Sequence, residues 1–307
     1  MDERFAIIDL GSNTFHLLVV QKQNRKTTIL HREKVGVKLA KAGINSDVIQ
    51  TDAEDRAMAA LQAFKKTTDS FGVTAIHAFG TSAIRNATNS TEIISRIKSM
   101  TGIDVTVLSG PAEAEMIYMG VRSALDLGNE ISLIVDIGAG SVEFILADRD
   151  RAWWSKSIEI GAQRILEKFS ISDPITSTEI QSINEFFDSS FREVDDAVKN
   201  FPPQTLVGSS GSFDTLSDMY CRENNIPVLE TDSETPLTTD FVHAAYRQII
   251  QTTRAQRLKL PGMIELRVDL IVVGSCMVRY ILEKYKINKI RVSRYSLKEG
   301  ALAMLSK

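Results

Sequence analysis

Two short turns built from small residues each follow an aspartate in this 307-residue sequence. Residues 11–14 (GSNT) follow Asp9. Residues 138–141 (GAGS) follow Asp136 and come before Glu143. Small residues let several backbone N–H groups converge on one point and approach a phosphate closely. Carboxylates beside such a turn can hold a hard divalent cation or orient a water molecule. These residue types are therefore suited to the hydrolysis of a phosphoanhydride.

The two turns belong to an internal repeat whose copies are offset by 127 residues. Residues 7–19 (IIDLGSNTFHLLV) and residues 134–146 (IVDIGAGSVEFIL) each run from apolar residues through the turn into a second apolar run. This pattern is typical of a β-hairpin. A Rossmann or Walker loop leads instead from a strand into a helix, and its glycine pattern is absent, which disfavours nicotinamide enzymes and P-loop ATPases. A single hairpin is often only a tight turn, but two such hairpins resemble the actin-like ATPase and sugar-kinase superfamily.

Around the hairpins, hydrophobic periodicity predicts an alternation of helices and strands. In the first half we expect helices at 52–71, 92–100 and 112–125, and strands at 75–80 and 105–108. In the second half we expect helices at 162–169, 178–200, 212–224, 239–254, 268–285 and 296–305, strands at 205–207 and 289–292, and a loop at 227–236. The chain is therefore expected to form two α/β domains.

Six short motifs are spread over the chain. They are residues 9–17 (DLGSNTFHL), 80–87 (GTSAIRNA), 108–114 (LSGPAEA), 135–143 (VDIGAGSVE), 208–212 (GSSGS) and 297–300 (LKEG). In this order they resemble the motifs of the exopolyphosphatase and guanosine pentaphosphate phosphatase family. The resemblance implies a two-domain actin-like α/β fold with an interdomain cleft. It implies domains at 1–123 and 124–296, with a C-terminal helix, 297–307, that packs back on the first domain.

The resemblance also implies an activity and the residues that perform it. The activity is Mg²⁺-dependent release of terminal phosphate from inorganic polyphosphate, with Mn²⁺ as an alternative metal. The family's general base corresponds to Glu113, and Asp9, Asp136 and Glu143 are expected to hold the metal. The expected phosphate-binding residues are Gly11, Ser12, Asn13, Thr14, Arg85, Gly138, Ala139, Gly140, Ser141, Gly208, Ser209 and Gly211. Without the family, Glu113 is more typical of a surface residue that complements a helix N-terminus.

Three other functions stay open. The first is a guanosine pentaphosphate phosphatase. The second is a sensor that binds guanosine penta- or tetraphosphate or polyphosphate with little hydrolysis, since Ala139 and Val142 replace a glycine and a threonine usual in the family and Tyr295 replaces a small residue. The third is a sugar kinase, although the second half carries no convincing aspartate motif for one. His16 holds the repeat position of Glu143 and could therefore approach the cleft, but a hydrogen-bonded structural histidine is the favoured interpretation.

The net charge and the distribution of basic residues indicate which classes of binding partner to expect. A net charge of −3 argues against a general nucleic-acid binder, which is normally basic overall. Basic residues nevertheless gather at 22–41, which includes Arg25, and at 284–298. Each run alone is typical of a solvated face, but together they could guide a polyanion.

Cysteine content and hydropathy indicate the cellular compartment in which the protein is expected. Cys221 and Cys276, the two cysteines, have no metal-binding spacing, so neither a disulfide framework nor a zinc site is expected. No apolar run approaches the ~20 residues that span a bilayer, and the first residues lack a secretory pattern. We therefore expect a cytoplasmic protein with no membrane partner, and a homodimer stays open.

Overall fold

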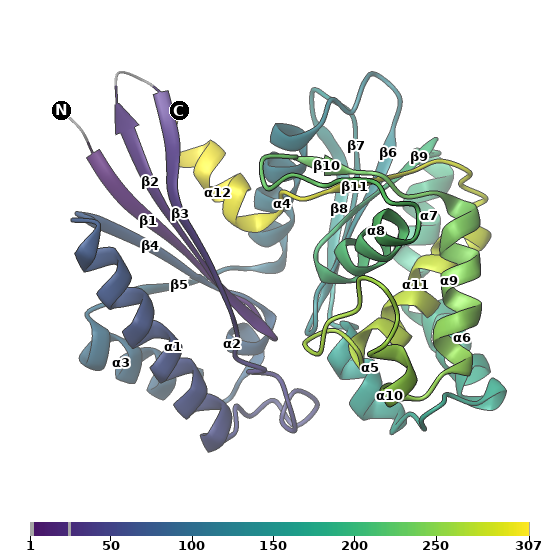
Figure 1. Cartoon of the computed structure of the whole chain (residues 1–307), viewed down its shortest axis with the longest axis horizontal. Helices are drawn as coiled ribbons and strands as arrows, with labels where there is room; N and C mark the ends of the chain where they lie inside the picture. Colours follow the sequence, from purple (N-terminus) through teal and green to yellow (C-terminus); the bar gives the residue numbers. More distant parts are fainter. Residues whose placement is uncertain (1–2, 24–25, 307) are drawn as a thin grey trace.

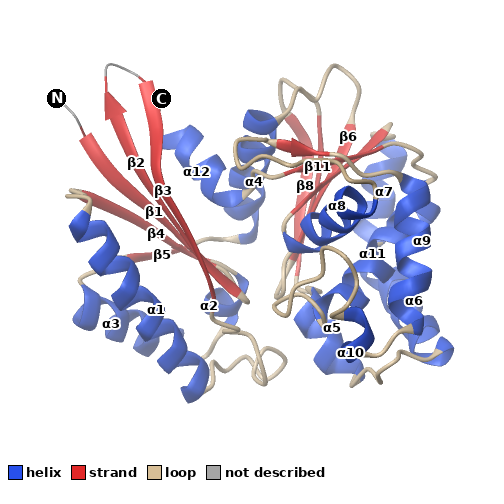
Figure 2. Ribbon diagram, viewed as in Figure 1, coloured by secondary structure: helices blue, strands red, loops and turns tan. Residues whose placement is uncertain are grey.

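The computed structural model describes residues 3–23 and 26–306, which form two α/β halves on either side of a central helical layer (Figure 1). Each half is built on one β-sheet with helices packed against it (Figure 2). The predicted bounds at residues 1 and 307 and the basic residue Arg25 lie outside the described residues.

The first sheet has the strand order β3-β2-β1-β4-β5. Its strands are β1 (Glu3–Leu10), β2 (Thr14–Gln23), β3 (Lys26–Gly36), β4 (Ala75–Gly80) and β5 (Val105–Val107). β1 pairs antiparallel with β2, as the predicted hairpin requires, and parallel with β4. The outer pairs continue the pattern, β2 with β3 antiparallel and β4 with β5 parallel.

The second sheet has the order β10-β11-β9-β6-β7-β8. Its strands are β6 (Ser132–Ile137), β7 (Val142–Ala147), β8 (Ala152–Ile158), β9 (Thr205–Ser209), β10 (Glu234–Thr235) and β11 (Ile290–Ser293). From β8 to β11 the order and the strand directions repeat those from β3 to β5 in the first sheet. The duplicated topology confirms the expected two-domain actin-like α/β fold.

Twelve helices are described within residues 3–23 and 26–306. They are α1 (Thr51–Ser70), α2 (Ser82–Asn86), α3 (Ser90–Thr101), α4 (Gly110–Ala124), α5 (Ala162–Phe169), α6 (Ser177–Ser190), α7 (Arg192–Asn200), α8 (Gly211–Glu223), α9 (Thr239–Gln251), α10 (Arg254–Arg257), α11 (Leu270–Tyr285) and α12 (Leu297–Leu305). α1 and α3 bury one face of the first sheet, while α5 to α9 and α11 bury one face of the second.

The layer between the two sheets consists of α4 and α12 (Figure 1). Ile117 of α4 packs with Ile134 and Ile145 of the second sheet, and Ala301 of α12 packs with Ile7 of β1. A Cβ at Gly120 of α4 or at Gly300 of α12 would collide with the backbone of the other helix, so these two glycines permit the close contact. α4 therefore touches both halves, and the domain bound at residue 123 stays a prediction.

One long helix was predicted wrongly. Residues 178–200 form two helices, α6 and α7, because the chain leaves the helical conformation at Phe191. The Phe191 ring is fully buried against Phe144, Phe187 and Tyr280, so tertiary packing overrides the local helical pattern. The edge strands β3 and β8 and the short elements α2, α10 and β10 were not predicted.

The predictions about cysteine and membrane segments can be compared directly with the structure. Cys221 and Cys276 are free and buried. Over the described ranges, no helix combines the length and the apolar composition needed to cross a bilayer.

Candidate active site

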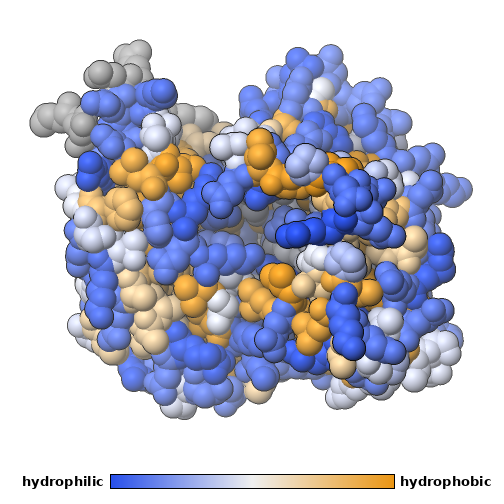
Figure 3. All heavy atoms as spheres, in the orientation of Figure 1, coloured by the Kyte–Doolittle hydropathy of each residue, from blue (hydrophilic) through white to orange (hydrophobic). Residues whose placement is uncertain are grey.

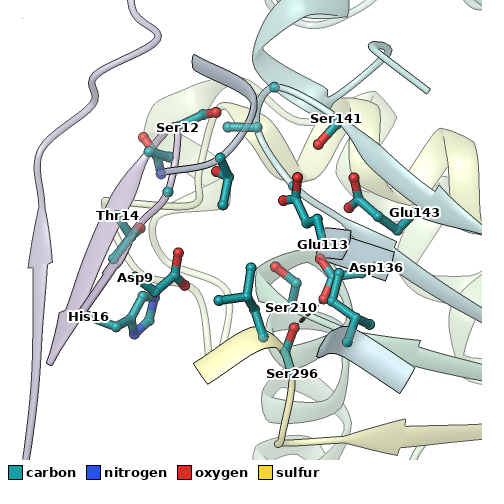
Figure 4. Close-up of a pocket in the computed structure, with 18 of the residues that line it drawn as sticks. Asp9, Ser12, Thr14, His16, Glu113, Asp136, Ser141, Glu143, Ser210 and Ser296 are labelled. Atoms are coloured by element: carbon teal, nitrogen blue, oxygen red, sulfur yellow. Dashed lines mark hydrogen bonds between the residues drawn. The ribbon is translucent and has the colours of Figure 1, made fainter. Parts of the chain in front are cut away.

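The two predicted turns lie together at one cavity of about 90 Å³, at the ends of β1 and β6 (Figure 4). Both whole turns and the four carboxylates Asp9, Glu113, Asp136 and Glu143 line it. Figure 4 shows Asp9 on one wall, with the other three carboxylates on the wall opposite. The lining residues that were not predicted as site residues are His16, Thr81, Ile117, Ser210, Arg267, Ser296 and Leu297.

The turns themselves are shaped alike. A Cβ at Gly11 would lie 2.8 Å from the carbonyl oxygen of Thr14, and a Cβ at Gly138 would lie 2.9 Å from that of Ser141. The two turns also touch, because a Cβ at Gly140 would lie 2.5 Å from the hydroxyl of Ser12. Only glycine fits these three positions without displacing backbone or neighbours. The repeat therefore brings the two glycine-containing turns into contact.

The first turn contains two buried side-chain atoms that are unpaired in the described structure. Among the described residues, Asn13 Nδ2 and Thr14 Oγ1 are buried with no hydrogen-bond partner. Buried polar groups are almost always paired in folded proteins, so such atoms beside a cavity indicate that a ligand completes them. Asn13 Nδ2 is a donor and Thr14 Oγ1 can donate, which suits the oxygens of a phosphate.

Glu113 lies in the first turn of α4, whose N-terminus is capped by Ser109. Its Oε2 accepts a hydrogen bond of 2.6 Å from Arg85 Nη1. Burial raises the pKa of Glu113 to about 7, although the Arg85 guanidinium opposes the shift. A carboxyl that titrates near neutrality, directed into a cavity, is suited to take a proton from water.

Arg85 does not line the cavity but lies behind Glu113. Its Nη1 also donates to the carbonyl oxygen of Leu108 at 3.1 Å, and its Nη2 donates to Glu159 Oε1 at 2.6 Å. The guanidinium that was predicted to bind phosphate is thus held by two carboxylates in this structure. Its contact with phosphate stays a prediction.

Asp136 and Glu143 are buried on the second hairpin. Ser209 and Ser296 donate to Asp136 Oδ2 at 2.7 and 2.5 Å, and Ser157 donates to Glu143 Oε1 at 2.7 Å. Burial raises the pKa of Asp136, although these serine bonds oppose the shift. Burial, together with the nearby charges of Glu113 and Asp136, raises the pKa of Glu143 well above its usual value.

On the first hairpin, burial raises the pKa of Asp9 to about 7, while Lys298 opposes the shift. His16, opposite Asp9 in the strand register, has its pKa lowered well below the usual value by burial and then by Lys298 and Lys34. His16 is therefore neutral. Four carboxyl groups therefore share the cavity with the guanidinium of Arg267.

This donor set suits a hard divalent cation. It contains carboxylate and hydroxyl oxygens, which Mg²⁺ prefers, and the buried negative charge calls for a counter-ion. However, no group of three His, Cys, Asp or Glu side chains within the described ranges is arranged to hold a metal by itself. The residues therefore fit a cation bound by one or two carboxylates together with substrate oxygens, which is the usual situation for Mg²⁺.

Residues 208–211, a third turn of small residues with predicted phosphate-binding positions, contribute differently from expectation. Ser210 lines the cavity, whereas Gly208, Ser209 and Gly211 do not. Ser209 instead holds Asp136, and a Cβ at Gly208 or Gly211 would collide with the Phe213 ring or the Arg267 guanidinium, respectively. Their contacts with phosphate stay predictions.

A larger chamber of about 880 Å³ adjoins the cavity, and His16 and Arg267 line both. Figure 3 shows a recess with hydrophilic residues around it between the two halves. Arg32 and Lys34 from one basic run and Arg294 and Lys298 from the other line this chamber. Acidic residues, among them Asp214, Asp218 and Glu299, line it too, so its charge is mixed. Lys284 and Arg291 point elsewhere and pair with Asp188 and Glu234.

Arg267 is a residue that the sequence analysis missed. It lies in the segment before α11, and its guanidinium makes no ion pair among the described residues. Burial lowers its pKa, although Asp214 and Asp136 oppose the shift. No motif surrounds Arg267 in the sequence, so only the fold reveals its position between cavity and chamber.

Fold and site together define a two-domain actin-like protein with a carboxylate-lined cleft between paired turns. The chain belongs to the Ppx/GppA phosphatase family, whose model matches residues 18–307.

Three known proteins illustrate the relationship. The crystal structure of an exopolyphosphatase from Cytophaga hutchinsonii is 38% identical, covers 99% of this chain and 98% of that one, and superposes with a TM-score of 0.96. Exopolyphosphatase 1 of Mycobacterium tuberculosis is 26% identical over 97% of this chain and 87% of its own length. A guanosine-5'-triphosphate,3'-diphosphate pyrophosphatase of Photobacterium profundum is 27% identical over 99% of this chain and 59% of its own length.

Proposed function

We propose that the protein is an exopolyphosphatase that hydrolyses the terminal phosphoanhydride of inorganic polyphosphate. The observation that carries this proposal is the cavity that Glu113 shares with both turns, the first of which offers the unpaired atoms Asn13 Nδ2 and Thr14 Oγ1. A terminal phosphate between the turns would pair both atoms and lie beside the carboxylate.

In the proposed reaction, Glu113 orients a water molecule and accepts one of its protons. The water oxygen forms a bond to the terminal phosphorus, and the bond from that phosphorus to the bridging oxygen breaks. The products are orthophosphate and a polyphosphate chain that is one unit shorter. Backbone N–H groups of both turns hold the phosphate oxygens. Arg85 orients Glu113 through their 2.6 Å bond from behind the cavity.

A divalent cation would complete this site. Asp136 and Glu143 would hold Mg²⁺, or Mn²⁺ in its place, with Asp9 on the opposite wall, and the cation would offset phosphate charge. The two serines bonded to Asp136 and the one bonded to Glu143 fix both carboxylates in place.

Guanosine pentaphosphate is a second candidate substrate, and the adjoining chamber favours it. An extended polyanion is best matched by uniformly basic walls, whereas this chamber also presents Asp214 and Asp218 and the ring of Tyr295. Carboxylates accept hydrogen bonds from the N–H groups of a guanine, and an aromatic ring can stack on a base. A guanosine in the chamber would place its phosphates toward the cavity.

Phosphate release from long-chain polyphosphate and from guanosine pentaphosphate, measured in parallel with Mg²⁺ and with EDTA, tests the proposal. Release from polyphosphate that EDTA abolishes is the expected result. Phosphate release from guanosine pentaphosphate but not from polyphosphate would assign the protein as a guanosine pentaphosphate phosphatase instead. Tight binding of either ligand by folded protein without any release would refute both and favour a sensor.

A further inference from the structure

Glu159 lies between β8 and α5 in the second half, yet it binds side chains of the first half. Its Oε1 accepts from Arg85 Nη2 at 2.6 Å, and its Oε2 accepts from the Ser82 hydroxyl at 2.5 Å. Both partners belong to α2. Charge-assisted bonds of this length are among the strongest polar contacts in proteins. Glu159 therefore ties the two halves together.

Arg85 also connects Glu159 to Glu113, the proposed base. Arg85 binds Glu159 with one terminal nitrogen and Glu113 with the other, and both distances are 2.6 Å. Side-chain exposure is 16% for Arg85 and 7% for Glu113, so water competes little for the bond between them, whereas the Glu159 side chain is 36% exposed. A guanidinium held through both terminal nitrogens has one orientation, whereas a guanidinium released from Glu159 keeps only the bonds of Nη1 and can turn about them, which shifts Glu113.

A second set of contacts crosses between the halves close by. Arg164 of α5 donates to the carbonyl oxygen of Ile44 at 2.6 Å, and Asn45 donates to the carbonyl oxygen of Arg164 at 3.0 Å. The N–H of Ala42 donates to Glu167 Oε1 at 2.7 Å. These bonds also depend on closure of the halves, and none of them involves Arg85 or Glu113. Arg164 Nη2 also lies 3.4 Å from Glu159 Oε2, whereas the bond from Ala42 to Glu167 is independent of Glu159.

We propose that Glu159 is a positioning residue that, through Arg85, orients Glu113 when the two halves are closed. The proposal rests on the proposed function, because it concerns the orientation of the base in that reaction. Opening of the halves would separate Glu159 from Arg85 and leave Glu113 without a fixed orientation. Closure and hydrolysis are thereby coupled through one carboxylate.

The test compares Glu159→Ala with Glu167→Ala, a matched control that removes another bond between the halves. Misplacement of a reacting group by about 1 Å can lower turnover about 10²-fold. We expect Glu159→Ala to lower kcat on polyphosphate by roughly 10- to 100-fold with KM changed by less than about threefold. Glu159→Gln, which keeps an acceptor oxygen for Arg85, should recover part of that loss. A kcat in Glu159→Ala within about twofold of wild type, or an equal loss in Glu167→Ala, would overturn the proposal.

A distance measurement makes the result independent of activity. Spin labels on Lys66→Cys and Glu223→Cys, exposed positions on α1 and α8, report the separation of the halves. Glu159→Ala should broaden the distance distribution, and an unchanged distribution would overturn the coupling. Absence of phosphate release from wild-type protein would refute the proposed function, while the distances would still show whether Glu159 holds the halves closed.

Discussion

Asp136 lies directly opposite Glu143 in the register of the β6–β7 hairpin. The first hairpin repeats this arrangement with Asp9 opposite His16. The paired positions therefore hold two carboxyl groups in the second hairpin, and one carboxyl group and a neutral imidazole in the first. The repeat has thus diverged into one turn beside a pair of carboxylates and one turn beside a single carboxylate.

The metal requirement follows from this pair. Asp136→Asn and Glu143→Gln each remove one charge from the proposed cation site, so we expect the Mg²⁺ concentration for half-maximal phosphate release to rise roughly tenfold or more. Titration of activity with Mg²⁺ measures the change. Asp55→Asn on the exposed surface of α1 serves as the control and should match wild type. An unchanged Mg²⁺ requirement in both site variants would remove these residues from the cation site.

The contact between the turns gives a second prediction. Gly140→Ala would place a methyl group against the hydroxyls of Ser12 and Ser82 and force the turns apart. We expect kcat/KM to fall by about tenfold or more, equivalent to about 1.4 kcal/mol of transition-state stabilisation. Ala139→Gly, one residue away, removes a methyl group and should stay within about threefold of wild type. Equal kinetics in the two variants would show that the spacing of the turns is unimportant.

The pH dependence of stability has a predicted direction at Glu179. Although desolvation acts the other way, hydrogen bonds from Ser172 and Thr176 lower the pKa of Glu179 from 4.5 to about 2. The carboxylate therefore stabilises the folded state above about pH 4.5, and this contribution is lost as the pH falls toward about 2. Glu179→Gln should be less stable than wild type at pH 7, with a difference that shrinks below pH 5, as measured by denaturant unfolding. Glu223→Gln is the surface control, and a difference that grows on acidification would contradict the assignment.

The sequence is most informative where function depends on local spacing. The two hairpins, with Asp9 and Asp136 at equivalent positions, could be predicted because strand, turn and strand are contiguous. Residues brought in by topology could not be predicted. Arg267 lies 131 residues after Asp136, yet lines the same cavity. Glu159 reaches Arg85 only because the two sheets face each other across α4 and α12.

Tertiary packing also determines where a helix ends and why a glycine is required, which the local sequence pattern does not show. Periodicity continues through Phe191, and only the aromatic cluster around that ring shows why the helix divides there. In the third turn, small residues suggest phosphate binding, but Gly208 and Gly211 are small because Phe213 and Arg267 occupy the space beside them. A glycine-rich turn thus has two explanations that the sequence alone does not separate.

Replacement of Glu113 tests the central claim most directly. Glu113→Gln preserves the shape of the side chain but removes the carboxylate that would accept a proton from water. Phosphate release from polyphosphate should fall by roughly 10²- to 10⁴-fold, with the thermal unfolding midpoint close to that of wild type. Turnover of the folded variant near the wild-type value would contradict the assignment of Glu113 as the general base and, with it, the proposed mechanism.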